Sequence, residues 1–451
     1  MNRMKQSVIF VLTMALVITS FVTTTSKVHA AAPDLQLKAE AAILVDAETG
    51  RILFEKNADL LLPPASMTKM MTEYLLLEAI EEGKIKWDTP VKISDRAFKI
   101  SHDSSLSNVW LRKDADPAYT VKELFEAAAI YSANGATMAL AETIAGSEAN
   151  FVKMMNDKAK ELGLKKYTFV NSTGLNNRDL KGMHAAGGPE EMNMMSARAT
   201  AKLAYHLLKD YPEVLETAKI PVKLFRKGTD DENRMINWNW MLEGNPRQGY
   251  EYEGVDGLKT GSTDIAGYSF TGTAKRNGTR LISVVMKTGS NPERFEETTK
   301  LLDYGFNNFT KKEVVKAGYT VKDKSTLPVV KGKEKTVDVQ TTKPLTVVML
   351  NGEEEKYKPK ATWNNKVLNK NGELTAPVKK GDQVGTLTLA YSGEGKDLGY
   401  ITEKAKQKSM VEIVAQDDVE KANWFVLMMR GIGGFFSDIW TNVVDTVKGW
   451  F

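Results

Sequence analysis

The sequence predicts an α+β fold: an antiparallel sheet with a cluster of helices, then a small all-β domain and a C-terminal amphipathic helix. Three observations support this prediction. Residues 41–54 and 255–286 contain runs that alternate between apolar and polar side chains, as strands do, while the segments between them have the length and spacing of helices. After residue 310 the chain changes to short alternating runs, and after residue 424 apolar residues recur at steps of three and four.

The first 30 residues have the composition of a secretory signal peptide. Arg3 and Lys5 precede an apolar stretch over residues 8–22, and Val28-His29-Ala30 offers a cleavage site after Ala30. The apolar stretch is short and interrupted by Thr and Ser, whereas a membrane span needs roughly 20 apolar residues. We therefore expect an exported protein that loses residues 1–30, with an uncleaved anchor as the alternative.

The composition excludes several functional classes. The chain has a formal net charge of +4, but residues 1–30 carry three basic side chains and no acidic ones. The mature chain is therefore nearly neutral, and nucleic-acid binding has no support. The sequence contains no cysteine, which excludes a thiol nucleophile, a zinc–cysteine site and any disulfide. Residues 31–451 are enough for two or three domains of about 150 residues each.

The first domain, expected at residues 31–310, holds most of the helices. Thr120 and Glu123 form a capping box at the start of one helix, and residues 132–135 interrupt it as a loop. The same rules of spacing and capping predict a hairpin over 41–54, a buried helix over 67–80, helices that end at 145 and 162, a polar loop over 182–193, a helix over 199–208, strands over 255–260, 268–274 and 281–286, and a closing helix over 298–309.

A separate small β domain is expected over residues 311–415. Thr336–Val339 and Thr386–Leu389 alternate in polarity, and Asn351-Gly352 is a signal for a hairpin turn. The segment contains no cluster of catalytic residue types. We therefore interpret it as a spacer or a partner-binding module.

Residues 416–451 are expected to form a linker and an amphipathic helix. Apolar residues share one face of the segment 424–451, and charged or polar residues share the other. The longest unbroken apolar run is Trp424–Met429, so the helix cannot span a bilayer and is expected to lie in the membrane interface. A helix docked on a domain core and a dimerising helix are the alternatives.

The chemistry is expected to centre on Ser66-Met67-Thr68-Lys69, the only Ser-x-x-Lys in the chain. A serine hydroxyl is a poor nucleophile near neutral pH and needs a base and donors that hold the developing oxyanion. Ser66 precedes a buried helix, and Lys69 is three residues on, within reach of the hydroxyl. Lys69 must be neutral to accept a proton, and burial with a second ammonium nearby would lower its pKa. Alternatively, Ser66 is only a helix cap and Lys69 a surface charge.

Two further motifs follow. Ser132-Ala133-Asn134 lies in the break between helices, where Ser132 can relay a proton and Asn134 can donate to a substrate amide; alone it would be a helix-breaking loop. Lys-Thr-Gly occurs at 259–261 and at 287–289. The first copy precedes a hairpin, whereas Lys287 ends an apolar strand and enters a turn. We therefore assign the function to Lys259, which also supplies the second ammonium.

Other site types find no support in the sequence. His102, His184 and His206 have neither metal-ligand spacing nor a Gly-x-Ser-x-Gly partner. A Ser-His-Asp triad and a zinc hydrolase are therefore not expected.

Ser-x-x-Lys, Ser-x-Asn and Lys-Thr-Gly together are the motifs of penicillin-binding proteins and class A β-lactamases. The chain most resembles low-molecular-mass penicillin-binding proteins that are serine-type D-alanyl-D-alanine carboxypeptidases. The segments that carry the resemblance are Ala42–Asp46, Pro64–Lys69 and Asp256–Gly261. The signal peptide, the β domain and the amphipathic segment 424–451 also resemble those of this family. It implies a penicillin-binding, β-lactamase-like transpeptidase fold for residues 31–310.

The resemblance also implies a function. The enzyme would hydrolyse the terminal D-Ala-D-Ala bond of peptidoglycan stem pentapeptides and release D-Ala, using no metal and no cofactor. β-Lactam antibiotics would be inhibitors, and the enzyme would have roles in the cell wall and cell shape. It would act at the outer face of the cytoplasmic membrane, attached peripherally through residues 424–451. Ser66 would form the acyl-enzyme, Lys69 would accept its proton, and Ser132 would pass a proton to the departing D-Ala.

The same resemblance assigns the substrate-binding residues. Asn134 would donate to the substrate amide, and the backbone N–H groups of Ser66 and Ser262 would hold the oxyanion. The terminal carboxylate would be bound by the strand that carries Lys-Thr-Gly and by a nearby arginine. These carboxylate-binding residues would be Lys259, Thr260 and Arg294, and Gly261 is also placed among the substrate-binding residues.

Two rival functions stay open. A β-lactamase of the same superfamily is one, but the Glu-x-x-Leu-Asn segment of the class A deacylating glutamate is missing. A non-catalytic, membrane-anchored wall-binding scaffold is the other, and the presence of every catalytic residue type speaks against it. A strict transpeptidase or endopeptidase would be a milder variant of the favoured function.

Overall fold

The computed structural model describes residues 35–322, 324–393 and 397–430. The expected signal peptide, residues 1–30, lies outside the described residues. So does the part of the expected amphipathic helix beyond residue 430.

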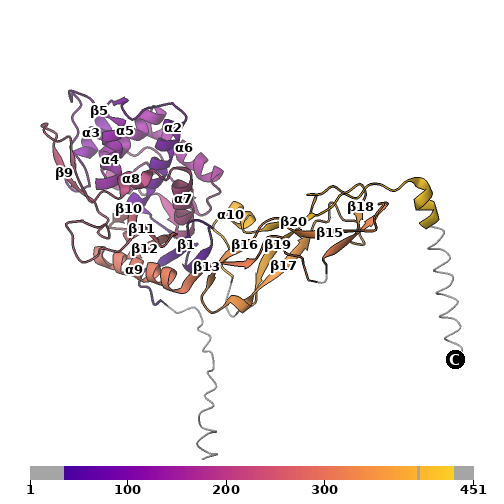
Figure 1. The fold of residues 1–451 in the computed structure, drawn as a ribbon. Coiled ribbons are helices and arrows are strands. Elements are labelled where there is room, and N and C mark those ends of the chain that lie inside the picture. The colour runs from indigo at the N-terminus through magenta and orange to yellow at the C-terminus, as the bar shows by residue number, and fades with distance from the viewer. Residues whose placement is uncertain (1–34, 323, 394–396, 431–451) are drawn as a thin grey trace, which may run out of the picture. The chain divides into compact units, whose positions relative to one another are not determined.

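An antiparallel five-stranded sheet is the framework around which the first part of the chain folds (Figure 1). The N-terminal hairpin joins this sheet beside strands from much later in the chain, with Ile43 opposite Val284. In sheet order, the strands are β10 (Val255–Thr263), β11 (Gly267–Arg276), β12 (Thr279–Thr288), β1 (Ala41–Asp46) and β2 (Ile52–Lys56). The predicted hairpin and the three predicted strands of this sheet are confirmed.

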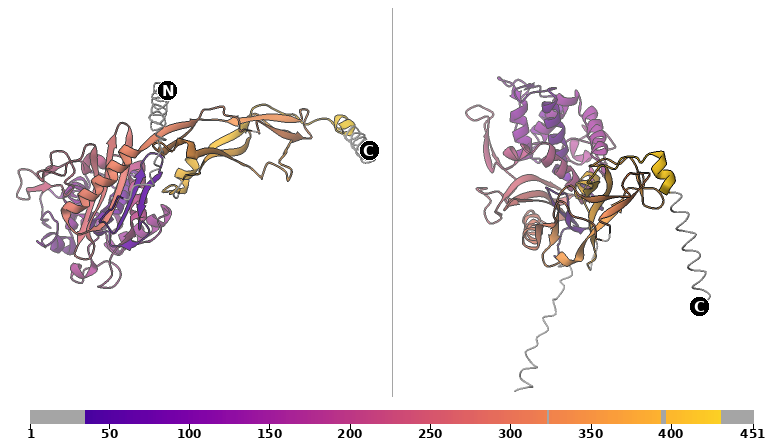
Figure 2. Two further views of the ribbon diagram at one scale, coloured as in Figure 1. Left: turned by 90° about the horizontal axis from the view of Figure 1, so that it is seen from below. Right: turned by 45° about the vertical axis from the view of Figure 1, so that its right-hand side comes forward.

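Helices cover both faces of this sheet, and Figure 2 shows it between them. Since successive side chains of a strand point to opposite faces, Ile43 packs in one hydrophobic cluster with α2 and α7, and Leu44 packs in another with Phe295 and Leu301 of α9. The helices are η1 (Ala65–Thr68), α2 (Lys69–Glu81), α3 (Asp95–Ser101), α4 (Val121–Tyr131), α5 (Asn134–Ala145), α6 (Glu148–Glu161), η2 (Asn177–Leu180), α7 (Ala197–Asp210), α8 (Val214–Ala218) and α9 (Asn291–Asn308).

Three small sheets complete this part of the molecule. The first of them ties the chain before η1 to the segment that follows the long polar loop over 182–193. They are β3 (Leu61–Leu62) with β7 (Met194–Ser196) and β6 (Tyr167–Thr168), β4 (Pro90–Val91) with β5 (Tyr119–Thr120), and β8 (Val222–Phe225) with β9 (Asn233–Ile236).

Local signals in the sequence explain several helix ends. Thr120 and Glu123 form the predicted capping box of α4. The start of α9 was predicted wrongly at residue 298, because Ser290-Asn291-Pro292 has the composition of a turn. Ser290 instead caps α9 through Glu293 N–H, and Pro292 is tolerated in the first turn, where its missing N–H would have no helical partner.

The second part of the chain is built mainly of strands, as predicted, and its described residues up to 415 also include one short 3-10 helix and one short α-helix. The strands form a six-stranded sheet of order β17-β19-β20-β15-β14-β18 and a separate pair, β13 with β16. The elements are β13 (Phe309–Val315), β14 (Thr326–Val330), β15 (Thr336–Thr341), β16 (Leu345–Leu350), η3 (Glu354–Lys356), β17 (Tyr357–Trp363), β18 (Leu374–Thr375), β19 (Gln383–Tyr391), α10 (Glu403–Lys408) and β20 (Val411–Ala415).

The hairpin predicted at Asn351-Gly352 does not form. A turn is present, with Gly352 at a φ of 81°, but the strands on its two sides do not pair. β16 pairs with β13, whereas β17 pairs with β19. The residues of a turn determine the local bend of the chain. Which strands pair depends on contacts across the whole sheet.

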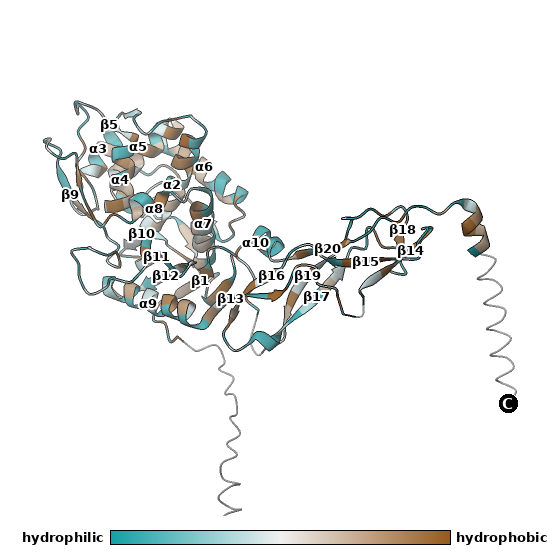
Figure 3. Cartoon of the chain, viewed as in Figure 1, coloured by the Kyte–Doolittle hydropathy of each residue, from teal (hydrophilic) through white to brown (hydrophobic). Residues whose placement is uncertain are grey.

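A helix begins at Trp424 and is described as far as Arg430. Trp424 is 74% exposed and Phe425 54% exposed, and the segment is coloured as hydrophobic in Figure 3. Within the described residues, no helix has the length and apolar content that crossing a bilayer requires.

Candidate active site

Ser66 lies in the 3-10 turn η1, which leads directly into α2. The predicted single helix over 67–80 is therefore divided: Ser66 belongs to the tighter turn, and Lys69 is the first residue of α2. Ala65, just before Ser66, has a φ of 47°. The turn places the half-buried Ser66 beside the fully buried Lys69.

The Lys69 amine has three oxygen neighbours. Its Nζ lies 2.9 Å from Ser66 Oγ, 2.7 Å from Asn134 Oδ1 and 2.9 Å from the carbonyl oxygen of Thr173. The two carbonyl-type oxygens can only accept. A neutral amine has two protons for them and keeps its lone pair for the Ser66 hydroxyl. This arrangement suits an amine that accepts the proton of Ser66.

The charge state of Lys69 follows from its surroundings. Burial lowers its pKa well below the ordinary value, because a charged ammonium loses its hydration there, and the nearby Lys259 ammonium lowers it further. Glu73 acts in the opposite direction and is the smallest of the three influences. Both causes named from the sequence are therefore present in the structure.

Ser132 and Asn134 lie at the junction of α4 and α5. Ser132 has left-handed backbone angles, φ 60° and ψ 29°, at the end of α4. Asn134 was expected in the loop but is the first residue of α5, and the Ser107 carbonyl oxygen accepts from its backbone N–H at 3.0 Å. The hydrogen bonds of Lys69 and Lys259 do not include Ser132. The structure thus brings Asn134 onto Lys69 and leaves the Ser132 hydroxyl unattached to either lysine.

Lys259, Thr260 and Gly261 lie on β10, the edge strand that packs against η1. A Cβ at position 261 would lie 2.3 Å from the carbonyl oxygen of Pro64, so only glycine allows this close approach. Lys259 Nζ has one long contact, 3.5 Å to the carbonyl oxygen of Thr260. The second Lys-Thr-Gly lies at the end of β12, where Lys287 is 43% exposed and pairs with Glu40 at 2.9 Å.

Ser262 follows Gly261 on the same strand and lines a pocket of about 570 Å³ together with Tyr268 and Lys287. Arg294 lies behind this strand on α9 and is only 1% exposed. Its Nη1 donates to the carbonyl oxygens of Gly261 and Ser269, each at 3.4 Å. Burial lowers the pKa of Arg294 to about 9, which leaves it charged at neutral pH. The expected direct contact with a substrate carboxylate is therefore not open in the free protein, since the guanidinium is covered by β10 and β11.

One segment that contributes to the site, residues 172–174, is not part of any of the three sequence motifs. The carbonyl oxygen of Thr173 holds Lys69, and Gly174, at a φ of 85°, approaches so closely that a Cβ would lie 1.9 Å from the Ala65 carbonyl oxygen. Glu148 holds this segment by accepting from Ser172 N–H at 2.9 Å. A backbone carbonyl carries no signal in the sequence, although Gly174 marked a turn.

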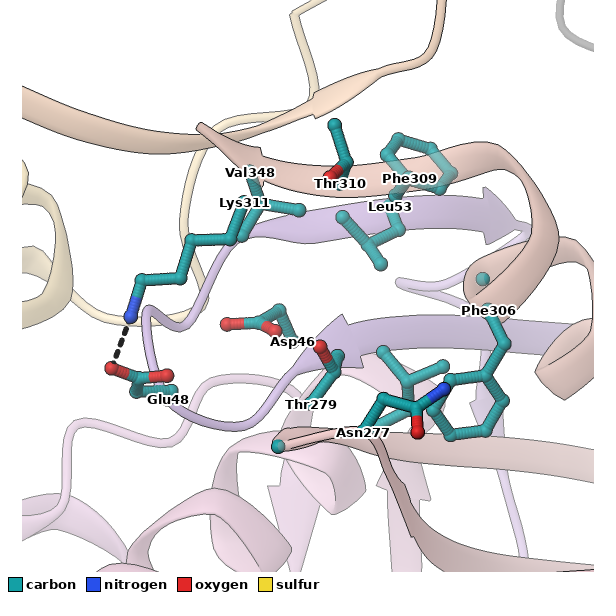
Figure 4. Close-up of a pocket in the computed structure, with 13 residues that line it drawn as sticks. Asp46, Glu48, Leu53, Asn277, Thr279, Phe306, Phe309, Thr310, Lys311 and Val348 are labelled. Carbon is teal, nitrogen blue, oxygen red and sulfur yellow. Dashed lines mark hydrogen bonds and ion pairs between the residues drawn. The ribbon is translucent and has the colours of Figure 1, made fainter. Parts of the chain in front are cut away.

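A separate pocket of about 230 Å³ lies away from these residues. It is lined by the end of β1, the turn between β11 and β12, and the start of β13, and Lys311 pairs with Glu48 at its mouth (Figure 4). It contains none of the residues grouped around Ser66. Among the described residues, no three His, Cys, Asp or Glu side chains are close enough to hold a metal ion.

Comparison with known proteins decides the family. Residues 26–290 match the family model of D-alanyl-D-alanine carboxypeptidase, and residues 309–421 match the model of the C-terminal domain of penicillin-binding protein 5. The D-alanyl-D-alanine carboxypeptidase DacF of Bacillus subtilis is 33% identical over 400 residues, which cover 89% of this chain and 90% of that protein. The chain belongs to the D-alanyl-D-alanine carboxypeptidase family.

Solved structures agree with this assignment. A peptidoglycan synthesis regulatory factor, PBP3, of Streptococcus pneumoniae is 37% identical with a TM-score of 0.65, covering 85% of this carboxypeptidase and 99% of that chain. Penicillin-binding protein D2 of Listeria monocytogenes, solved in an ampicillin-bound form, is 34% identical with a TM-score of 0.50. The match covers 61% of this chain and 100% of that chain. The predicted fold and the predicted activity, that of a serine-type carboxypeptidase, are confirmed.

Proposed function

We propose that this carboxypeptidase removes the terminal D-Ala of peptidoglycan stem pentapeptides through an acyl-enzyme on Ser66. The observation that carries the proposal is the 2.9 Å contact between Ser66 Oγ and the buried Lys69 amine, whose other neighbours are acceptors. A nucleophile needs a base within hydrogen-bond reach. Lys69 is such a base, and its lowered pKa favours the neutral amine that can accept the proton.

Acylation then follows from the positions of these groups. Ser66 Oγ attacks the carbonyl carbon of the D-Ala-D-Ala bond while its proton passes to Lys69 Nζ. The backbone N–H groups of Ser66 and Ser262 hold the oxyanion. When the C–N bond breaks, the departing amine of D-Ala takes the proton from Lys69 through the Ser132 hydroxyl, and Lys69 becomes neutral again. A water molecule later hydrolyses the ester and restores Ser66.

The terminal carboxylate of the substrate is held by the part of the site that contains Lys259 and Arg294. Lys259 offers an ammonium with only one long contact among the described residues, to the backbone carbonyl oxygen of Thr260. The Thr260 hydroxyl is proposed to bind the same carboxylate. Arg294 contributes its charge and supports Gly261 from behind, while Asn134 can donate its amide to the peptide. β-Lactams carry an equivalent carboxylate and acylate Ser66 in the same position.

We also propose the limits of the chain's parts and its location. Residues 1–30 are removed on export, 31–310 form the peptidase domain, 311–415 the β domain, and 416–451 a linker and membrane anchor. The exposed Trp424 and Phe425 support the last assignment, since such side chains favour the interface between lipid and water. The enzyme would then act at the outer face of the cytoplasmic membrane.

Product analysis tests this function. Purified enzyme incubated with diacetyl-Lys-D-Ala-D-Ala should release free D-Ala, and labelled penicillin should bind in a ratio of about one to one by acylation of a single serine. Rapid, repeated turnover of penicillin without D-Ala release would favour a β-lactamase. Binding to wall fragments with neither reaction would favour a scaffold.

A further inference from the structure

Glu73 is a buried carboxylate that the mechanism above does not use. It lies on α2 one turn after Lys69, so both side chains share one face of the helix. The residue is 5% exposed, and within the described part of the chain its buried Oε1 has no hydrogen-bond partner. A buried polar atom without a partner costs stability, so its presence here calls for a reason.

The charges around Glu73 are those of the active site. Lys69 acts on it from its own helix and Lys259 from β10, and no other charged group among the described residues shifts its pKa. Arg294, on α9, acts in turn on Lys259. The site therefore holds three basic groups and one acidic group away from water.

The two lysines differ in how the protein satisfies them. Lys69 has three oxygen neighbours between 2.7 and 2.9 Å, two of which are carbonyl-type acceptors. Within the described parts of the chain, Lys259 has a single contact of 3.5 Å, which is too long for a strong hydrogen bond. A charged Lys259 thus depends on a nearby anion far more than Lys69 does, and Glu73 is the anion available.

We propose that Glu73 is a positioning residue for the reaction: it is the buried counterion that keeps the Lys259 ammonium charged, so that Lys69 is the amine that becomes neutral. The proposal rests on the proposed function, because it concerns the lysine that holds the substrate carboxylate. The proposal assigns a charged state to Lys259 and a neutral state to Lys69, a difference that their motifs alone do not explain.

The pKa shifts of Lys259, Lys69 and Glu73 agree with these two charge states. Burial lowers the pKa of Lys259 to about 8, and Glu73 is the principal influence that opposes the fall. For Lys69, the lowering by Lys259 outweighs the raising by Glu73. Burial raises the pKa of Glu73 itself to about 7, against the pull of both lysines. Between these values, near pH 7 to 8, Glu73 is mostly ionised and Lys259 mostly protonated.

The test is the pH dependence of the full-length enzyme carrying Glu73→Gln, which keeps the shape and removes the charge. Glu78→Gln is the matched control, because Glu78 lies on the same helix but pairs with Lys158 instead. The readouts are the acylation rate by labelled penicillin and the separate kcat and KM for diacetyl-Lys-D-Ala-D-Ala. Thermal unfolding verifies that each variant is folded.

In Glu73→Gln the loss of activity at alkaline pH should move down by about one pH unit, which is the scale of shift that one nearby charge produces. At pH 8 the effect should appear as about a fivefold higher KM with kcat changed far less, because a shift of one unit from a pKa of about 8 lowers the protonated fraction of Lys259 by that factor. Glu73→Asp keeps a charge with shorter reach and should give a smaller shift. It also supplies the test if Glu73→Gln does not fold.

Three outcomes separate the possibilities. An alkaline limb that stays in place in Glu73→Gln, or moves equally in Glu78→Gln, overturns the proposal. Normal acylation with an acyl-enzyme that persists would overturn it too, and would place Glu73 in deacylation. If the wild-type enzyme neither binds penicillin nor releases D-Ala, the proposed function fails, which is a different result from an unshifted profile in an active variant.

Discussion

Gly261 lies against Pro64 so closely that a Cβ at position 261 would be 2.3 Å from the Pro64 carbonyl oxygen. The edge strand that carries Lys259 is thereby held against the turn that carries Ser66. Real Cβ atoms do not approach an oxygen this closely, so an alanine must push the strand and the turn apart. The distance between the nucleophile and the carboxylate-binding lysine depends on the absence of a side chain.

Gly261→Ala should therefore slow acylation without unfolding the protein. A displacement of about 1 Å at a reacting centre costs on the order of 10²-fold in rate, and we expect a loss of that size for labelled penicillin. Gly188→Ala is the control, because its Cβ would enter open space. A wild-type rate in Gly261→Ala would show that the close approach of β10 is not required.

Lys69→Met should lower acylation by about 10²- to 10⁴-fold, the usual contribution of a positioned base. Methionine fills the buried space of the lysine chain but cannot accept a proton. Rapid-mixing measurements with penicillin give the rate, and thermal unfolding shows whether the core is intact. A folded variant that acylates at the normal rate would exclude Lys69 as the base.

The pH profile of kcat/KM should be a bell whose alkaline limb lies near pH 8. As the pH rises through the Lys259 pKa of about 8, the ammonium loses its proton and with it the attraction for the substrate carboxylate. The acid limb reports protonation of Lys69, whose pKa lies well below the ordinary value, so activity should persist to neutral pH. Initial rates at low substrate concentration, measured from pH 5 to 10, test both limbs. An enzyme active only above pH 10 would mean that Lys69 keeps an ordinary lysine pKa.

Asn134→Asp should move the acid limb to higher pH. The amide oxygen of Asn134 lies 2.7 Å from Lys69 Nζ, and a carboxylate there would favour the charged ammonium. Opposite charges at this distance shift a pKa by about 1 to 3 units. The same profile of kcat/KM measures the shift, with Asn150→Asp on exposed α6 surface as the control. An unmoved acid limb would mean that Lys69 is not the group that titrates there.

Truncation before Trp424 should release the enzyme from membranes while leaving D-Ala release unchanged. The exposed Trp424 and Phe425 would be removed with the rest of the helix. Fractionation of cells that express each form, followed by penicillin labelling of the soluble and membrane fractions, measures the distribution. Membrane retention of the truncated enzyme would contradict the anchor.

The side chains of the site were predictable because the chemistry demands particular residue types in a particular order. Lys259 could be chosen over Lys287 from its place before a hairpin, and the structure has Lys287 paired with Glu40 instead. Thr173 could not be found in this way, since its contribution is a backbone carbonyl. Gly174 could have been, because a glycine after three polar residues marks a position of special backbone geometry.

Glu73 was also visible in the sequence, as the one charged residue in an otherwise apolar stretch of the helix after Lys69. A lone carboxylate in a buried helix needs a partner or a function, and that signal was not used. Strand partners in the β part could not be predicted, because Asn351-Gly352 forms its turn without joining neighbouring strands. Local chemistry predicts turns, while pairing depends on the whole sheet.

The central claim is that Ser66 is the nucleophile. Mass spectrometry of the intact enzyme after penicillin treatment, with the adduct located by peptide mapping, tests it most directly. A single adduct on the peptide that contains Ser66, absent from Ser66→Ala but present in Ser104→Ala, is the predicted result. An adduct on another residue, or one that persists in Ser66→Ala, would contradict the account.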